Sequence, residues 1–243
     1  MTQGQVTQGH KVDGQPAFVL HAYPFRETSL IVEAFARDFG RVALLARGAR
    51  RPRSALRGVL MAFQPLELSW AGKGEIKTII KAEWQGGQPL LSGRALFCGY
   101  YLNELLLDLL PREDAHGRLF SVYADTLRRF ADGPKESDIR LFERSFLQEL
   151  GYGLTLKHDE KGQPIDRALY YAYEIERGPV RARETGGAAP MVSGKTLADL
   201  DAGDFSDPRS LLEAKHLMRT LIAHYLGGKG LETRKIFLEL QEP

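Results

Sequence analysis

The feature that most constrains the fold of this chain is a change in the spacing of its apolar residues near residue 90. Before that point, short runs rich in β-branched and aromatic residues alternate with turn residues. After it, apolar residues recur every three or four positions. The first pattern is typical of strands and the second of helices. The β-rich runs are 16–23, 28–36, 41–47, 63–71 and 75–84.

Two of the turns between these runs indicate hairpins. Asp38-Phe39-Gly40 separates the second run from the third, and Gly72-Lys73-Gly74 separates the fourth from the fifth. Five short strands in a segment of this length fit a small closed barrel such as an OB-fold, whose open face and loops commonly bind single-stranded nucleic acid. We therefore predict an α+β protein, in which an N-terminal five-stranded OB-fold barrel precedes an all-helical C-terminal domain.

The second half of the chain shows start and stop signals of helices. Ser92 is a candidate N-cap, Ser193 is another, and Asp207-Pro208 supplies a cap followed by a proline in the first turn. The spacing predicts one helix that begins at Ser92. Further helices are predicted at 118–131, 137–150, 193–200, 208–226 and 232–240. The predicted division is a flexible tail at 1–15, an OB-fold DNA-binding domain at 16–85, and a helical domain at 92–243. An irregular insert at about 157–190 has room for a small hairpin.

Charge is distributed unevenly along the chain. The net charge of the 243 residues is only +2, but residues 41–81 alone carry +7 and the remainder carries −5. Such asymmetry favours a polyanionic partner, although ordinary solvated faces are the alternative explanation. The basic residues that we assign to a DNA surface are Arg41, Arg47, Arg50, Arg51, Arg53, Arg57, Lys73, Lys77 and Lys81.

A single-strand surface also needs flat side chains on which bases stack. Phe25, Phe63, Trp70 and Trp84 are candidates for this role, with core packing as the alternative for each. Lys77 and Lys81 are an even number of residues apart, so a regular strand would place them on one face. No segment resembles a base-reading recognition helix, so we expect binding that depends on charge and not on sequence.

Catalytic and cofactor motifs are missing from the sequence. It contains no P-loop, no GxGxxG that opens a helix, no HExxH and no GxSxG. Cys98 is the only cysteine, which excludes a disulfide and a four-cysteine zinc site, and His216 and His224 lie too far apart for a helical zinc pair. No stretch approaches the roughly 18 apolar residues that a membrane helix needs. We predict a non-enzymatic cytoplasmic protein without metal or cofactor.

Several ordered segments carry a resemblance to a known family. They are the segments 23–30 (YPFRETSL), 40–50 (GRVALLARGAR), 72–78 (GKGEIKT), 101–105 (YLNEL), 150–153 (LGYG) and 225–229 (YLGGK). In these the chain resembles RecO, the bacterial recombination mediator family. The resemblance implies a non-catalytic, nucleoid-associated protein that binds single- and double-stranded DNA and anneals complementary strands. With RecR, such a protein helps to load RecA onto strands coated by the single-stranded DNA-binding protein, SSB.

The resemblance also implies that the helical domain grips the acidic C-terminal tail of SSB. We expect Arg140 to bind the terminal carboxylate, because it lies on a predicted helix that ends in the LGYG segment. The groove-lining candidates are Leu119, Tyr123, Phe142 and Phe146, with Arg128 and Arg129 as assisting cations. Some members of the family carry a four-cysteine zinc module after this segment, whereas this chain has no cysteine there. We expect Tyr170, Tyr171 and Tyr173 to hold the region by packing.

Two other classes of function compete with the mediator. One is a protein-interaction adaptor whose basic face binds acidic peptides, so that nucleic-acid binding is incidental. The other is a nuclease, which would need clustered carboxylates for a catalytic metal ion. Salt-sensitive strand annealing distinguishes the mediator from the adaptor, and magnesium-dependent cleavage would identify a nuclease.

Overall fold

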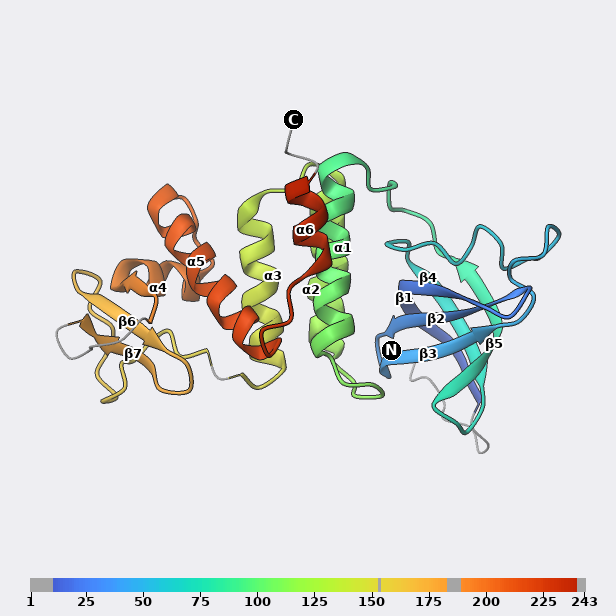
Figure 1. Cartoon of the computed structure of the whole chain (residues 1–243), viewed down its shortest axis with the longest axis horizontal. Coiled ribbons are helices and arrows are strands. Elements are labelled where there is room, and N and C mark those ends of the chain that lie inside the picture. Colours follow the sequence, from blue (N-terminus) through green and yellow to red (C-terminus); the bar gives the residue numbers. More distant parts are fainter. Residues whose placement is uncertain (1–10, 153, 183–188, 240–243) are drawn as a thin grey trace. The chain divides into compact units, whose positions relative to one another are not determined.

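The computed structural model describes residues 11–152, 154–182 and 189–239. These residues pack as two compact units, one formed by residues 11–134 together with 231–239, and the other by the described residues between 135 and 230. The first unit therefore contains the β-rich segment, the first two helices and the last helix (Figure 1). The change in apolar spacing near residue 90 marks a change of secondary structure, whereas the compact units divide after Pro134.

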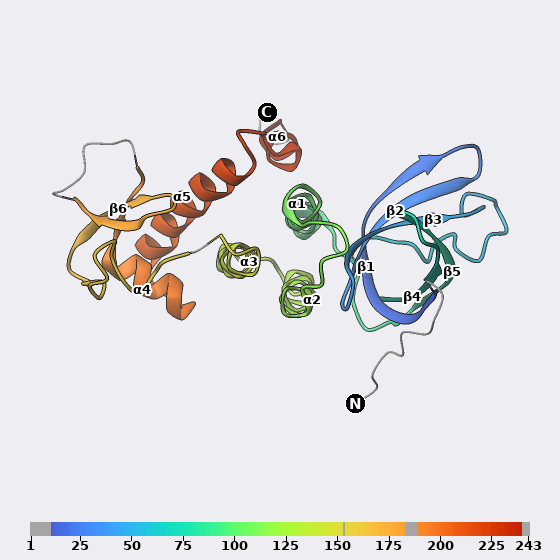
Figure 2. The same cartoon turned by 90° about the horizontal axis from the view of Figure 1, so that it is seen from below.

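Five strands of the first unit close into a barrel with the order β1-β2-β3-β5-β4 (Figure 2). Their bounds are β1 Lys11–Phe25, β2 Ser29–Ala36, β3 Gly40–Ala46, β4 Leu66–Ala71 and β5 Ile76–Trp84. All neighbours pair antiparallel except β3 and β5, which pair parallel. The barrel confirms the predicted five-stranded OB-fold.

The first strand begins earlier than the sequence predicted. Residues 11–15 are not part of a tail, because Lys11 pairs with Ala71 and Gln15 pairs with Leu68 of β4. The Gly14 amide also donates to the Ser69 hydroxyl at 3.0 Å. The polar segment KVDGQ shows little apolar alternation, so backbone pairing decides its structure. Residues 1–10 of the predicted tail lie outside the described residues.

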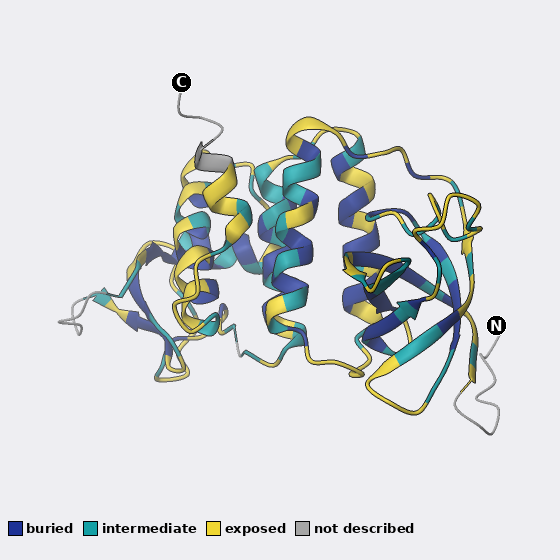
Figure 3. Cartoon of the chain, turned by 45° about the vertical axis from the view of Figure 1, so that its right-hand side comes forward, coloured by how far each residue is buried: buried dark blue, intermediate teal, exposed yellow. Residues whose placement is uncertain are grey.

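The barrel has a filled interior and an outer face that is partly covered by helices. Val32, Leu44 and Leu68 point inward and belong to the barrel core. On the outer face, Phe18 of β1 and Phe35 of β2 lie 5.4 Å from the ring of Phe120 in α2 (Gly117–Ala131), measured between ring centroids. The strand residues nearest α2 are therefore buried, as the dark segments in Figure 3 show.

Helix α1 (Gly93–Leu109) is pinned to the barrel by Asn103, which is 1% exposed. Its side-chain amide donates to the Leu20 carbonyl at 2.8 Å, and its side-chain oxygen accepts from the Tyr123 hydroxyl at 2.5 Å. Burial raises the pKa of Tyr123, so the hydroxyl keeps its proton and remains a donor. Asn103 thus links β1, α1 and α2.

Replacing Asn103 with alanine is expected to lower the free energy of unfolding by about 2 kcal/mol, because two hydrogen bonds of buried groups are lost. Urea denaturation followed by circular dichroism measures this change. Tyr123→Phe is the matched control, since it removes the bond to Asn103 while the bond from Asn103 to the Leu20 carbonyl stays in place, and it should cost about 1 kcal/mol. An unchanged midpoint for Asn103→Ala would contradict this role.

A carboxylate within α1 binds the start of the last helix, α6 (Glu232–Glu239). Glu104 of α1 accepts from the backbone amides of Glu232 and Thr233 at 2.6 and 3.0 Å, which satisfies two free amides at the start of α6. Ser92 occupies the N-cap position of α1, but its side chain makes no capping bond, so that part of the expectation was wrong.

The second unit combines helices with a small sheet. The helices are α3 Glu136–Glu149, α4 Gly194–Ala202 and α5 Pro208–Tyr225, and the strands are β6 Tyr170–Glu174, β7 Gly178–Arg181 and β8 Met191–Ser193. Ser193 accepts from the Thr196 amide and Asp207 from the Arg209 amide, which confirms both predicted caps. The sheet has the order β7-β6-β8, so this part is not all-helical. The β6–β7 hairpin lies within the insert in which the sequence left room for a small hairpin, but β8 was not expected, because it has too few residues to show alternation.

Two tyrosines hold the insert, while the third lies at its surface. Tyr171 and Tyr173 are buried, and their hydroxyls accept from the backbone amides of Asp166 and Thr155 at 2.9 and 3.0 Å. Burial raises the pKa of Tyr173 to about 12. Tyr170 is 41% exposed and lies under the guanidinium of Arg209. Packing by Tyr171 and Tyr173 thus connects β6 to the loops before it.

Candidate nucleic-acid interface

The end of the barrel's outer face farther from Phe120 carries a row of apolar and hydroxyl side chains across four strands. The register pairs Tyr23 with Ile31, Ile31 with Leu45, and Leu45 with Thr78. Directly paired residues point to the same side of a sheet, so these four share the outer face. Tyr23 is 46% exposed, and the other three are half-buried.

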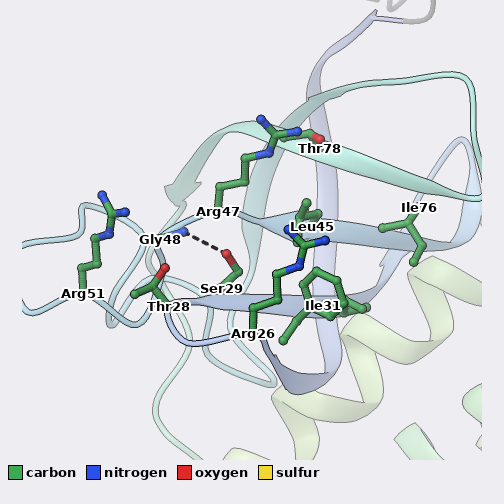
Figure 4. Close-up of a pocket in the computed structure, with 11 residues that line it drawn as sticks. Arg26, Thr28, Ser29, Ile31, Leu45, Arg47, Gly48, Arg51, Ile76 and Thr78 are labelled. Carbon is green, nitrogen blue, oxygen red and sulfur yellow. Dashed lines mark hydrogen bonds between the residues drawn. The ribbon is translucent and has the colours of Figure 1, made fainter.

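A hollow of about 690 Å³ lies on this end of the face. Ile31, Leu45, Ile76 and Thr78 line it from the strands, and Figure 4 shows Arg26 and Arg47 beside these residues and Arg51 farther away, next to Gly48 and Thr28. Thr28, Ser29, Gly48 and Phe25 complete the lining. Its wall therefore combines an apolar floor with three guanidinium groups.

The pairing of β2 with β3 brings these arginines together. Because the two strands run antiparallel, the turn before β2 lies beside the loop after β3. The Arg50 amide donates to the Thr28 carbonyl at 2.8 Å, and the Gly48 amide donates to the Ser29 hydroxyl at 3.3 Å. These bonds fix the loop against the turn, so Arg26, Arg47 and Arg51 reach one hollow.

Arg26 was absent from the predicted DNA surface, although the hairpin could have revealed it. It is exposed, adopts a left-handed φ of 53°, and places its guanidinium carbon 5.2 Å from the centroid of the Phe25 ring. Its sequence position lies outside the basic segment. Only the antiparallel pairing of the next two strands carries it to Arg47.

The remaining arginines of the basic loop are also exposed. Arg50 donates to the carbonyls of Arg26 and Glu27 at 3.4 and 3.3 Å, so it shapes the turn as well as adding charge. Arg53 and Arg57 lie farther along the loop, where short backbone turns place them at the surface. The loop as a whole presents five positive charges to solvent.

Arg41 lies elsewhere and has a structural role. Its guanidinium donates to the Leu107 carbonyl of α1 at 2.7 Å and lies 4.0 Å from the Glu33 carboxylate, which Arg112 also binds. Burial lowers the pKa of Arg41. The expectation that Arg41 belongs to the open basic surface was wrong, because it lies at the start of β3, where it contacts α1.

The three lysines do not form one surface. Lys77 pairs with Glu113, and its side chain is only 14% exposed, whereas Lys81 lies beside Glu83 and is 60% exposed. The β4–β5 register shifts between Lys81 and Ile79, so Ile80 is an extra residue that reverses the alternation. The prediction that Lys77 and Lys81 share a face was therefore wrong. Lys73 is exposed in the turn between β4 and β5.

The four aromatic candidates have different environments. Phe63 and Trp70 are 3% and 1% exposed and belong to the core, so they cannot stack on a base. Trp84 is 59% exposed, and its indole donates to Gln64 at 3.0 Å. Phe25 is the candidate that lines the hollow. Tyr23 was not among the candidates, although it begins the outer row.

The residues predicted to form a groove for the SSB tail are mostly buried. Leu119 and Tyr123 are buried in the first unit, and Phe142 and Phe146 in the second, so the expected open groove was wrong. Arg140 is 6% exposed and lies 2.9 Å from the Glu143 carboxylate. Arg128 and Arg129 are exposed on α2, where Arg128 pairs with Asp125 and Arg129 donates to the Thr126 hydroxyl.

Among the described residues, no group of three or more histidine, cysteine or carboxylate side chains is arranged to hold a metal ion. Within the same residues, the helices are too short or too polar to cross a bilayer.

Comparison with known proteins identifies one family along most of the chain. The family models described as "Recombination protein O N terminal" and "Recombination protein O C terminal" match residues 14–87 and 90–235. DNA repair protein RecO of Dechloromonas aromatica is 68% identical over 96% of this chain and 98% of its own length. The RecO proteins of Aromatoleum aromaticum and Nitrosospira multiformis are 56% and 52% identical, over 98% and 95% of this chain and 100% and 96% of their own lengths. The chain therefore belongs to the RecO family of DNA repair proteins.

Proposed function

We propose that this protein is a non-catalytic mediator of recombinational DNA repair. It binds single- and double-stranded DNA, anneals complementary strands and, with RecR, helps to load RecA onto SSB-coated strands. Family membership supports the repair role, since the relatives are named DNA repair proteins. We place this activity in the cytoplasm, in association with the nucleoid.

The observation that carries the DNA-binding part is the group of arginines at the open end of the barrel face. Arg26, Arg47 and Arg51 surround one hollow, and Arg50, Arg53 and Arg57 extend the charge along the adjoining loop. Guanidinium groups bind phosphates through paired N–H donors, and clustered cations release the counterions of a nucleic acid. This surface replaces the broader nine-residue surface predicted from sequence.

We propose that the second unit binds the C-terminal tail of SSB. A carboxylate that reached Arg140 would have to share the guanidinium with Glu143 and with the Lys215 carbonyl, which lies 3.5 Å away. By contrast, Arg128 of the first unit is exposed and pairs with Asp125, so a peptide could reach its guanidinium from solvent. Binding of a synthetic tail peptide to the intact protein tests this partner.

Salt dependence tests the electrostatic part of the proposal. If about five phosphates of a single strand are neutralised, the logarithm of the association constant should fall with the logarithm of salt concentration with a slope of about −3.5. Fluorescence anisotropy of a labelled oligonucleotide measures the slope, and annealing of complementary strands is followed with and without SSB. A slope near zero together with no annealing would favour the adaptor.

A further inference from the structure

The outer face of the barrel is apolar at both ends, but only one end is covered within the described residues. Phe18 and Phe35 lie under Phe120 and are 3% and 0% exposed. Farther along β1 and β2, Tyr23 is 46% exposed and Ile31 is half-buried, and Leu45 of the neighbouring strand β3 is half-buried as well. An uncovered apolar surface bounded by polar groups marks a place where a partner binds.

The groups around this row restrict what can occupy it. The hollow is lined by Arg26, Arg47 and Arg51 and by the hydroxyls of Thr28, Ser29 and Thr78, and its lining includes no carboxylate. The Tyr23 ring is supported from one side by His21, whose ring centroid is 4.3 Å away. The occupant must therefore offer a flat apolar face and, within one side-chain length, negative charge.

A nucleotide in a single strand offers both features, because its base is unpaired and its phosphates flank it. In a duplex the base faces are stacked inside the helix, so only base edges and phosphates are accessible. A duplex can therefore contact the arginines without covering the apolar row.

We propose that the row formed by Tyr23, Ile31 and Leu45 seats one unpaired base, while Arg26, Arg47 and Arg51 hold the phosphates beside it. Single strands then bind this site through base and phosphate, and duplexes bind it through phosphate alone. The proposal rests on the proposed function, namely that the protein binds DNA at this end of the barrel. It assigns to Tyr23 and Leu45 the preference for single strands.

The test uses the double variant Tyr23→Ala and Leu45→Thr of the full chain and three ligands. The ligands are a labelled oligonucleotide, the same strand with abasic sites throughout, and the corresponding duplex. Loss of one stacked base should weaken single-strand binding about tenfold. Affinity for the abasic strand and the duplex should change less than about twofold, and the salt slope should be unchanged because no phosphate contact is lost.

Controls separate this proposal from the proposed function. Leu212→Ala alters a 54% exposed apolar residue of α5 and should change no affinity. Equal weakening for all three ligands, or no weakening for any, would overturn the base seat while leaving DNA binding intact. A change of oligomeric state in the double variant would overturn it too, since the row would then be a subunit contact. If the wild type bound none of the ligands, the proposed function itself would fail.

Discussion

Replacing Arg140 with alanine is expected to lower the free energy of unfolding by about 3–5 kcal/mol. Its guanidinium lies 2.9 Å from the Glu143 carboxylate, and the two side chains are 6% and 0% exposed. Removing the cation takes away a charged partner that the buried carboxylate has in the native structure. Urea denaturation monitored by circular dichroism measures the loss.

This expectation changes how binding of the SSB tail is tested. Weaker tail binding by Arg140→Ala would report partial unfolding as readily as a lost contact. The double variant Arg140→Met and Glu143→Leu is the matched control, because an apolar pair of similar volume often replaces a buried ion pair at little cost. If this double variant unfolds at the same urea concentration as the wild type but no longer binds the tail, Arg140 contacts the tail. A wild-type midpoint for Arg140→Ala would show that the ion pair contributes little stability.

Neutralising the basic loop is expected to weaken single-strand binding by about a thousandfold at 0.1 M salt. Each phosphate contact contributes about −0.7 to the slope on a single strand, so five lost contacts correspond to a factor of about 10³ at that concentration. The strand-annealing activity should disappear with it. Fluorescence anisotropy and oligonucleotide annealing, with and without SSB, measure the two effects. The changed residues are Arg47, Arg50, Arg51, Arg53 and Arg57, each replaced by glutamine.

Replacing five arginines lowers the net charge of the chain from +2 to −3, which by itself weakens attraction to DNA. The control variant must therefore carry the same change in net charge. A second variant neutralises five exposed basic residues outside the segment 41–81. If the two variants lost affinity equally, overall charge and not the loop would explain binding. The residues of this control are Arg94, Lys161, Arg219, Lys229 and Arg234.

Much of the fold follows from local patterns. The alternation within residues 28–36 and 41–47, with Gly40 between them, predicted the β2–β3 hairpin that the structure contains. The caps at Ser193 and Asp207 were equally readable, because a side-chain oxygen before a helix satisfies a free amide whatever the surroundings. The strand β8 was missed because pairing with β6 and not its own composition defines it.

The candidate site was only partly predictable, since availability of a cation depends on its neighbours. Arg41 lies at the start of β3 and Arg47 directly follows its end, yet Arg41 donates to the Leu107 carbonyl of α1 while Arg47 lines the hollow. Arg26 joins the same hollow from outside the basic segment. Nothing in the sequence around these three arginines shows which of them are open to a ligand.

By itself, the sequence determined that the chain is a barrel followed by helices, that its charge is concentrated in residues 41–81, and which family it resembles. Spacing and charge are properties of residues close in the chain, so they can be read without a structure. Only the tertiary structure decided which cations are open to a ligand. The extra residue Ile80 puts Lys77 and Lys81 on different faces of β5, and Arg140 is buried in an ion pair with Glu143. Both results depend on register and packing between distant segments.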